Sequence, residues 1–112
     1  MIEQKDLLLV PFPFSDQSGR KVRPVIVISN NLFNKNSEDI IVVGVTSNIS
    51  KDKCAIKLDN KDLDEGKLFT ICCIKAENIL KLDKELIIKK IGKINSDIYK
   101  IIISKINEII KN

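Results

Sequence analysis

The apolar residues of this chain are concentrated in short runs, and polar stretches separate each run from the next. Runs of about four to eight apolar or alternating residues are typical of β-strands. The pattern predicts strands over residues 6–10, 22–29, 40–47, 54–59 and 68–74, followed by two less regular ones over 77–82 and 87–94. Residues 60–66 are polar and predict a connection without a strand, and a turn is expected near Asp83.

Two segments have helical features. Asn30 and Asn31 can cap a short helical turn that extends through Asn34. Near the C-terminus, Ser96 is the expected N-cap of a longer helix, with Asp97 in its first turn. Its apolar face recurs at helical spacing: Ile98, Ile102, Ile106, Ile109 and Ile110. These elements predict one domain over residues 1–112, mainly β with helices, built as a strongly bent sheet or partial barrel with the C-terminal helix packed on it.

Composition fits an ordinary globular protein. Apolar residues make up 44% of the chain and charged residues 30%. No apolar run is long enough to cross a bilayer and the N-terminus lacks a signal-peptide pattern, so a cytoplasmic protein with no membrane association is expected. The net charge of +4 favours a polyanionic partner, but it equally fits a solvated lysine surface.

Cysteine and histidine usage limits the chemistry. The chain has three cysteines and no histidine. Cys72 and Cys73 are adjacent in an apolar run, and no pair has the C-x-x-C spacing of a zinc site, so the cysteines are predicted to be buried, reduced thiols. Without histidine, Ser-His and Cys-His nucleophilic schemes are excluded. Catalysis would have to use arginine, carboxylates, hydroxyls or lysine.

Arginine is confined to one segment. Only Arg20 and Arg23 are arginines among the 19 basic residues, and Arg23 directly precedes Pro24. Proline restricts the preceding residue to extended backbone, and the planar guanidinium can bind two phosphate oxygens at once. Taken alone, Arg23 is better interpreted as a surface ion-pair residue, and Thr46 as a residue that simply ends a strand.

The arginine segment is part of a wider resemblance. The stretch LVPFPFSDQSGRKVRPVIVISN followed by IIVVGVTSN resembles the MazF/PemK family of toxins, and ENILKLDKELIIKKIGKI followed by a terminal helix is similar to the family's second half. The resemblance covers nearly the whole chain and implies a small SH3-like barrel of the CcdB/MazF type that forms a homodimer. It also implies the toxin of a type II toxin–antitoxin system, neutralised by a cognate antitoxin.

The resemblance also implies an activity and a site. Family members cleave single-stranded RNA without a metal or cofactor, through attack of a 2′-OH, leaving a 2′,3′-cyclic phosphate and a free 5′-hydroxyl. The matching positions make Arg23 and Thr46 the catalytic candidates. Further substrate-binding candidates surround them: Phe14, Ser15, Asp16, Arg20, Lys21, Ser47 and Asn48.

Several of these candidates have a plain alternative. Phe14 could stack on a base or anchor its loop in the core. Asp16 is the nearest loop carboxylate, but a solvated loop acid is the more ordinary interpretation. Ser47 points away from Thr46 if the strand is regular. No general base is identified among them.

The chain departs from the family at two places. Lys5-Asp6 stands where many members have Gly-Asp, which leaves the backbone turn there open. Asn78 and Leu80 replace Gln and Arg, so a basic group near the RNA of some relatives is absent at position 80. Base preference therefore does not carry over.

Two other functions remain possible on the same fold. One is a CcdB-like gyrase-interacting toxin, but those proteins act through a C-terminal end that contains tryptophan, and this chain has none. The other is a non-catalytic RNA-binding module, which the presence of both Arg23 and Thr46 disfavours. Cleavage of RNA by the purified protein would separate these functions.

Overall fold

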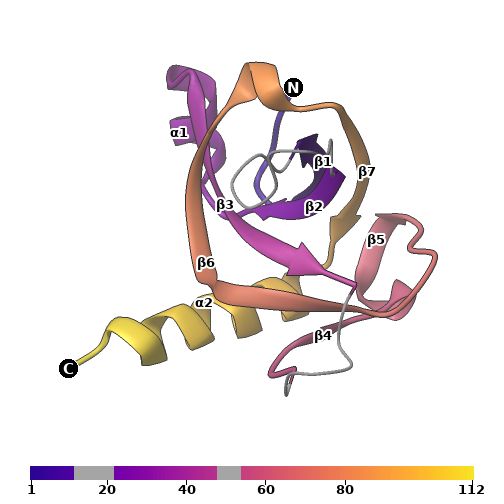
Figure 1. Cartoon of the computed structure of the whole chain (residues 1–112). Coiled ribbons are helices and arrows are strands. Elements are labelled where there is room, and N and C mark those ends of the chain that lie inside the picture. Colours follow the sequence, from indigo (N-terminus) through magenta and orange to yellow (C-terminus); the bar gives the residue numbers. More distant parts are fainter. Residues whose placement is uncertain (12–21, 48–53) are drawn as a thin grey trace, which may run out of the picture.

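The chain folds around one antiparallel sheet. The structure is a computed structural model, and it describes residues 1–11, 22–47 and 54–112. Within these residues, seven strands pair in the order β4-β6-β3-β2-β1-β7-β5, and Figure 1 shows how strongly the sheet bends. The strands are β1 (Asp6–Pro11), β2 (Val22–Val27), β3 (Asp39–Thr46), β4 (Lys57–Leu58), β5 (Leu63–Gly66), β6 (Cys72–Asp83) and β7 (Lys89–Ile94). The helices are α1 (Asn31–Asn36), α2 (Ser96–Ile110) and the short 3₁₀ turns η1 (Asn60–Asp62) and η2 (Lys84–Leu86).

The predicted fold class is confirmed, and the central strands lie where the apolar runs placed them. β1, β2, β3 and β7 overlap their predicted ranges, and η2 forms the turn near Asp83. In the described residues the pairing ends at β4 on one side and β5 on the other, so the sheet is a strongly bent open one. Strands β1, β2 and β3 are its middle, with β3 and β6 forming the longest pairing.

The edges of the sheet differ from the sequence prediction. Residues 60–66 were expected to lack a strand, but β5 pairs there with β7. β5 is almost entirely exposed, so its sequence carries no apolar alternation. The strand expected over 54–59 is reduced to β4. Ile56 and Leu58 are buried as the alternation of apolar and polar residues predicts, but this alternation indicates burial and not strand pairing. The two runs 68–74 and 77–82 are joined in β6, which begins only at Cys72.

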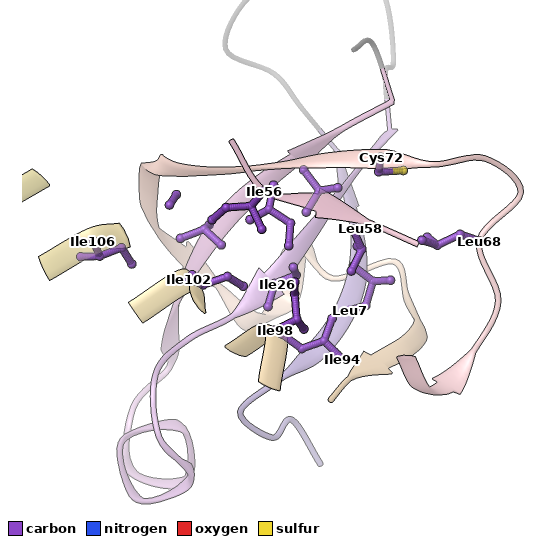
Figure 2. Close-up of a cluster of buried hydrophobic side chains, with 14 residues drawn as sticks. Leu7, Ile26, Ile56, Leu58, Leu68, Cys72, Ile94, Ile98, Ile102 and Ile106 are labelled. Carbon is purple, nitrogen blue, oxygen red and sulfur yellow. The ribbon is translucent and has the colours of Figure 1, made fainter. Parts of the chain in front are cut away.

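Two apolar clusters lie on opposite faces of the bent sheet. The larger one packs between the strands and α2, and Figure 2 shows Ile98, Ile102 and Ile106 of the helix together with Ile26 and Ile56. The smaller cluster uses the alternate residues of the same strands: Leu8, Val10, Val25, Val27, Ile40, Val42 and Leu82. Neighbouring side chains of a strand point to opposite faces, so β2 and β3 contribute to both clusters.

Both helices are capped by asparagine. Asn30 Oδ1 accepts a hydrogen bond from the Phe33 amide of α1 at 2.8 Å. For α2 the N-cap is Asn95 and not the predicted Ser96, because Asn95 Oδ1 accepts from the Ile98 amide at 2.9 Å. Figure 1 shows α2 running past the sheet toward the C-terminus. Ile109 and Ile110 are therefore 50% and 69% exposed, in contrast to their predicted place in the buried stripe.

The prediction of reduced thiols is wrong for two of the three cysteines. Cys54 and Cys73 form a disulfide, with 5.7 Å between their Cα atoms, whereas Cys72 is buried and free. The pairing of β4 with β6 sets Lys57 opposite Cys73 and so brings Cys54 within bonding range. This proximity is a tertiary effect, and a separation of 19 residues in the sequence gives no sign of it.

The turn before β1 keeps a glycine-like backbone despite its lysine. Lys5 has a φ of 80°, in the left-handed region that glycine adopts most easily. Its amide donates to the Val27 carbonyl at 2.8 Å, and its carbonyl accepts from the Ile94 amide at 2.9 Å. These two bonds tie the turn to β2 and β7, which explains why the conformation persists at a residue other than glycine.

Candidate functional site

Arg23 and Thr46 are brought together by the pairing of β2 with β3. In this antiparallel pair Val25 lies opposite Gly44. Continuing the register by two residues places Arg23 level with Thr46, near the start of β2 and at the end of β3. Both side chains are half-buried, and both line one hollow in the surface. Two residues that lie 23 positions apart in the sequence thus face the same space.

The hollow forms where an apolar face becomes polar. On β3 the buried Ile40 and Val42 are followed on the same face by Gly44 and Thr46. Gly44 contributes no side chain, and a Cβ added there would lie 3.5 Å from the Asn78 Cβ. Gly44 lines a cavity of about 220 Å³ together with apolar and polar residues of the neighbouring strands.

The lining of this cavity is cationic. The residues around it are Arg23, Pro24, Val25, Gly44, Val45, Thr46, Lys75, Asn78 and Leu80. Two of them carry a positive charge, one offers a hydroxyl and one an amide, and none of these described residues is acidic. A concave site with charges of one sign concentrates ions of the opposite sign. Since clefts for whole small molecules usually exceed about 300 Å³, the cavity suits one anionic group of a larger ligand.

The remaining predicted site residues either lie outside the lining of the cavity or are not described by the structure. Ser47 is exposed and is not among the residues that line the cavity, in agreement with its expected direction away from Thr46. The other candidates lie outside the described residues: Phe14, Ser15, Asp16, Arg20, Lys21 and Asn48. The site as described is therefore made by β2, β3 and β6.

Lys75 is the lining residue that sequence reasoning missed. It lies on β6 in the run CCIKAENIL, where it interrupts a series of buried side chains. A lone lysine between Ile74 and Ala76, which are both buried, is the one signal that could have drawn attention to it. Asn78 and Leu80 were noticed only as departures from the family, and both now prove to line the same cavity.

A buried acidic group lies away from the cavity, beside β7. Asp6 is fully buried, and its Oδ1 lies 3.3 Å from Lys90 Nζ. Glu3 accepts a hydrogen bond from Lys93 at 2.6 Å, which lowers the pKa of Glu3 and raises that of Lys93. These pairs connect the N-terminal turn with β7 and contribute to the fold, since none of the four lines the cavity.

The described residues hold no obvious metal site. Within residues 1–11, 22–47 and 54–112, no group of three or more histidine, cysteine, aspartate or glutamate side chains is arranged to bind a cation. In the same ranges, no helix has both the length and the apolar character needed to cross a membrane. Among the described residues that line the cavity, Arg23 and Lys75 carry a positive charge and Thr46 carries a hydroxyl.

Comparison with solved structures supports the same fold. MazF from Deinococcus radiodurans superposes with a TM-score of 0.73 at 16% identity, over 99% of this chain and 97% of that one. An endoribonuclease in complex with its cognate antitoxin, from a mycobacterial species, gives a TM-score of 0.70 at 18% identity, over 96% and 90% of the two chains. At such identities these likenesses establish the architecture.

Sequence comparison establishes the family. Endoribonuclease MazF of Staphylococcus epidermidis is 34% identical over 96 residues, which cover 81% of this chain and 76% of the relative. Residues 3–110 match the profile of a family described as the PemK-like, MazF-like toxin of type II toxin–antitoxin systems. The match includes all of α2 and every strand that the structure describes. The resemblance inferred from the motifs is confirmed, and the chain belongs to the PemK/MazF toxin family.

Proposed function

We propose that this chain is the toxin of a type II toxin–antitoxin pair and that it acts as a sequence-selective, metal-independent endoribonuclease on single-stranded RNA. The observation that carries the proposal is the cavity in which Arg23 and Thr46 lie level with each other on neighbouring strands. Its described lining is cationic and free of carboxylates, as a phosphate site requires. Family membership and the name of the staphylococcal relative support the same activity.

The reaction is a transfer within the RNA chain. The 2′-oxygen attacks the adjacent phosphorus, the bond from phosphorus to the 5′-oxygen breaks, and the products are a 2′,3′-cyclic phosphate and a 5′-hydroxyl. The 2′-OH loses its proton and the leaving 5′-oxygen gains one. Because negative charge builds on the phosphate oxygens in the transition state, preorganised donors aimed at those oxygens are the main source of acceleration.

Arg23 and Thr46 can supply such donors. The guanidinium of Arg23 can form two parallel, charge-assisted hydrogen bonds to the nonbridging oxygens. Pro24 restricts the backbone of Arg23 to the extended region and so limits how far the side chain can move. The hydroxyl of Thr46, which closes β3, can donate one further hydrogen bond to the same phosphate.

The positive charge of the cavity also indicates which partners the toxin can bind. A cationic cavity that holds an RNA phosphate should also accept an acidic segment of a cognate antitoxin, which would inhibit cleavage by occupying the site. The mycobacterial neighbour is described in complex with its antitoxin, which supports this part of the proposal. We further infer a homodimer that acts in the cytoplasm, which sedimentation at micromolar concentration can test.

The test of the activity is cleavage of a long RNA in the presence of EDTA, with the cut ends mapped. We expect cutting to persist and to leave cyclic phosphate and 5′-hydroxyl ends. A 2′-deoxy substitution at a mapped site is the matched control, and it should abolish cutting there because the nucleophile is gone. Cleavage that stops in EDTA and returns with magnesium would refute the mechanism. RNA binding without cleavage would point to the non-catalytic module instead.

A further inference from the structure

A row of three residues leads from the cavity to the β4 edge of the sheet. Thr46 on β3 lies opposite Cys73 on β6, and Cys73 lies opposite Lys57 on β4. Residues directly opposite each other in an antiparallel pair lie on the same face, with their Cβ atoms about 4.5–5.5 Å apart. Figure 1 shows β4 beside the start of β6, so Lys57 stands two strands away from Thr46.

The burial pattern fixes the face on which this row lies. Cys72 and Ile74 belong to the apolar cluster that packs against α2. Cys73, between them, therefore points to the opposite face, where the cavity is. On β4, Leu58 belongs to the same cluster under α2, so the preceding Lys57 points to the cavity face as well. Lys57 is exposed, and its ammonium group is accessible beside the cavity.

The fold itself makes little use of the charge of Lys57. Lys57 takes part in none of the ion pairs that join the described residues. Asp59, two positions further along the chain, is occupied as the cap of η1, where its Oδ1 accepts a hydrogen bond from the Asn60 amide at 2.7 Å. The cation at the β4 edge can therefore bind an external anion.

An RNA strand with one phosphate in the cavity brings further phosphates to the surrounding surface. Proteins that bind single-stranded nucleic acid follow its backbone with positively charged side chains. Neighbouring strands of a sheet are about 4.8 Å apart, so the backbone of Lys57 lies about 10 Å from that of Thr46. The long side chain of a lysine at this position can reach a phosphate close to the one held at Thr46.

We propose that Lys57 binds a phosphate of the RNA that flanks the phosphate being cut, and that the Cys54–Cys73 disulfide positions Lys57 for this contact. This inference rests on the proposed ribonuclease function and deepens it. The flanking phosphate carries the same charge in bound RNA and in the transition state. Lys57 should therefore increase RNA affinity without changing the rate at which bound RNA is cut.

The disulfide limits the movement of a very short strand. β4 has only two residues, and in the described chain it pairs with β6 alone. Cys54 precedes Lys57 by three positions and is bonded to Cys73, the residue opposite Lys57. Reduction by a dithiol adds two electrons and two protons to the S–S bond, which gives two protein thiols and converts the dithiol to its own disulfide. β4 is then held only by its short pairing and by the buried Ile56 and Leu58.

The first test compares Lys57→Met with the control Lys100→Met. Lys100 is also exposed, but it lies on α2, which packs against the other face of the sheet. The probe is an RNA made uncleavable by 2′-O-methylation at the cutting site. We expect Lys57→Met to bind it several-fold more weakly, with a slope of log affinity against log salt that is smaller by about 0.7. Lys100→Met should bind as the wild type does.

Two results would overturn the proposal at this stage. Equal losses of affinity in Lys57→Met and Lys100→Met would show that only the net charge matters. A slower single-turnover rate for Lys57→Met at saturating RNA would show that the lysine acts in the cutting step. The expected result is a wild-type rate at saturation, and Lys57→Arg should retain RNA affinity because it keeps the charge.

A neutral backbone analogue locates the phosphate. A methylphosphonate, which removes one negative charge, is placed in turn at each position that flanks the cutting site of the uncleavable RNA. At one of these positions the wild type should lose affinity and Lys57→Met should lose none. If the two proteins respond alike at every position, Lys57 contacts no particular phosphate and the proposal is wrong.

Reduction tests the positioning role of the disulfide. In dithiothreitol the wild type should approach the affinity of Lys57→Met, whereas the affinity of Lys57→Met itself should stay the same. Cys54→Ser should bind RNA as the reduced wild type does, with or without the reductant. A loss of affinity of the same size in the wild type and in Lys57→Met would overturn this role, since the disulfide would then act through another part of the protein.

Folding and the proposed function are controlled separately. Circular dichroism at the assay temperature identifies a variant or a reduced protein that is not folded. If Lys57→Met does not fold, Lys57→Gln takes its place, and reduction is compared at a lower temperature at which the protein stays folded. If the wild type does not cut RNA, the proposed function fails. If the wild type cuts RNA and the folded Lys57 variants bind it as tightly as the wild type does, only this inference fails.

Discussion

Reduction of the Cys54–Cys73 disulfide should weaken the fold by an amount set by the loop that it closes. The two cysteines are separated by 19 residues, and the connection between them includes β4, η1 and β5. In the chain-entropy description, a loop of this length removes enough freedom from the unfolded chain to contribute about 3 kcal/mol at 25 °C. With a urea m-value of about 1–3 kcal/mol/M, reduction should lower the unfolding midpoint by at least about 1 M.

The assay is urea unfolding of the oxidised protein with and without a reductant. Cys54→Ser is the matched control: it should unfold at the midpoint of the reduced protein and show no response to reductant. Thiol titration in denaturant should find one free thiol per chain before reduction, that of Cys72. Denaturant is needed because burial raises the pKa of the Cys72 thiol and keeps it unreactive in the folded state. Three free thiols in the oxidised protein would refute the reasoning, and so would a urea unfolding midpoint that does not change when reductant is added.

Three further substitutions test the fold and the cavity. Lys5→Gly should raise the free energy of unfolding by about 0.5–1 kcal/mol, since glycine adopts the left-handed backbone without strain. Lys5→Ala should not raise it, because alanine keeps the strain and only loses the hydrogen bond from Lys5 Nζ to Ser96 Oγ. Urea unfolding of both variants tests this difference. Ile102→Ala should cost about 2–5 kcal/mol because Ile102 is fully buried under the sheet, and Ile101→Ala, at a half-exposed position, should cost far less in the same assay. Gly44→Leu should fill the cavity and abolish RNA cutting. Gly44→Ala should be tolerated, since a Cβ at this position makes only ordinary van der Waals contacts. RNA cutting by the leucine variant would argue against this cavity as the active site.

The central strands and the pairing of the site residues could be predicted because simple periodicities govern them. β2 and β3 lie in the middle of the sheet and bury both faces, so their apolar runs are nearly continuous. The polar residues at their ends, Arg23 and Thr46, stand out against that background. Strand order then brings them together, since neighbouring antiparallel strands place the start of one beside the end of the other.

The remaining features depend on contacts that a local pattern does not encode. β5 is an exposed edge strand held by backbone pairing to β7, so its side chains carry no strand signal. The Cys54–Cys73 bond requires β4 to lie against β6. Lys75 joins the site through a bulge, which a regular alternation cannot anticipate. At the end of α2, Ile109 continues the helical spacing but lies beyond the sheet that would cover it.

The central claim is that Arg23 stabilises the transition state of RNA cleavage, and the variant Arg23→Lys tests it most directly. Lysine keeps the charge and loses the planar fork, so RNA affinity should stay nearly normal. Loss of one preorganised donor should slow single-turnover cleavage by roughly a hundred- to thousandfold, or about 2.7–4 kcal/mol. Thr46→Val should have a smaller effect because a neutral hydrogen bond is weaker than a charge-assisted one. Arg20→Lys, which changes the other arginine in the same way, should have a mild effect. Cleavage by Arg23→Lys at close to the wild-type rate would contradict the account and would make Arg23 a docking or structural residue.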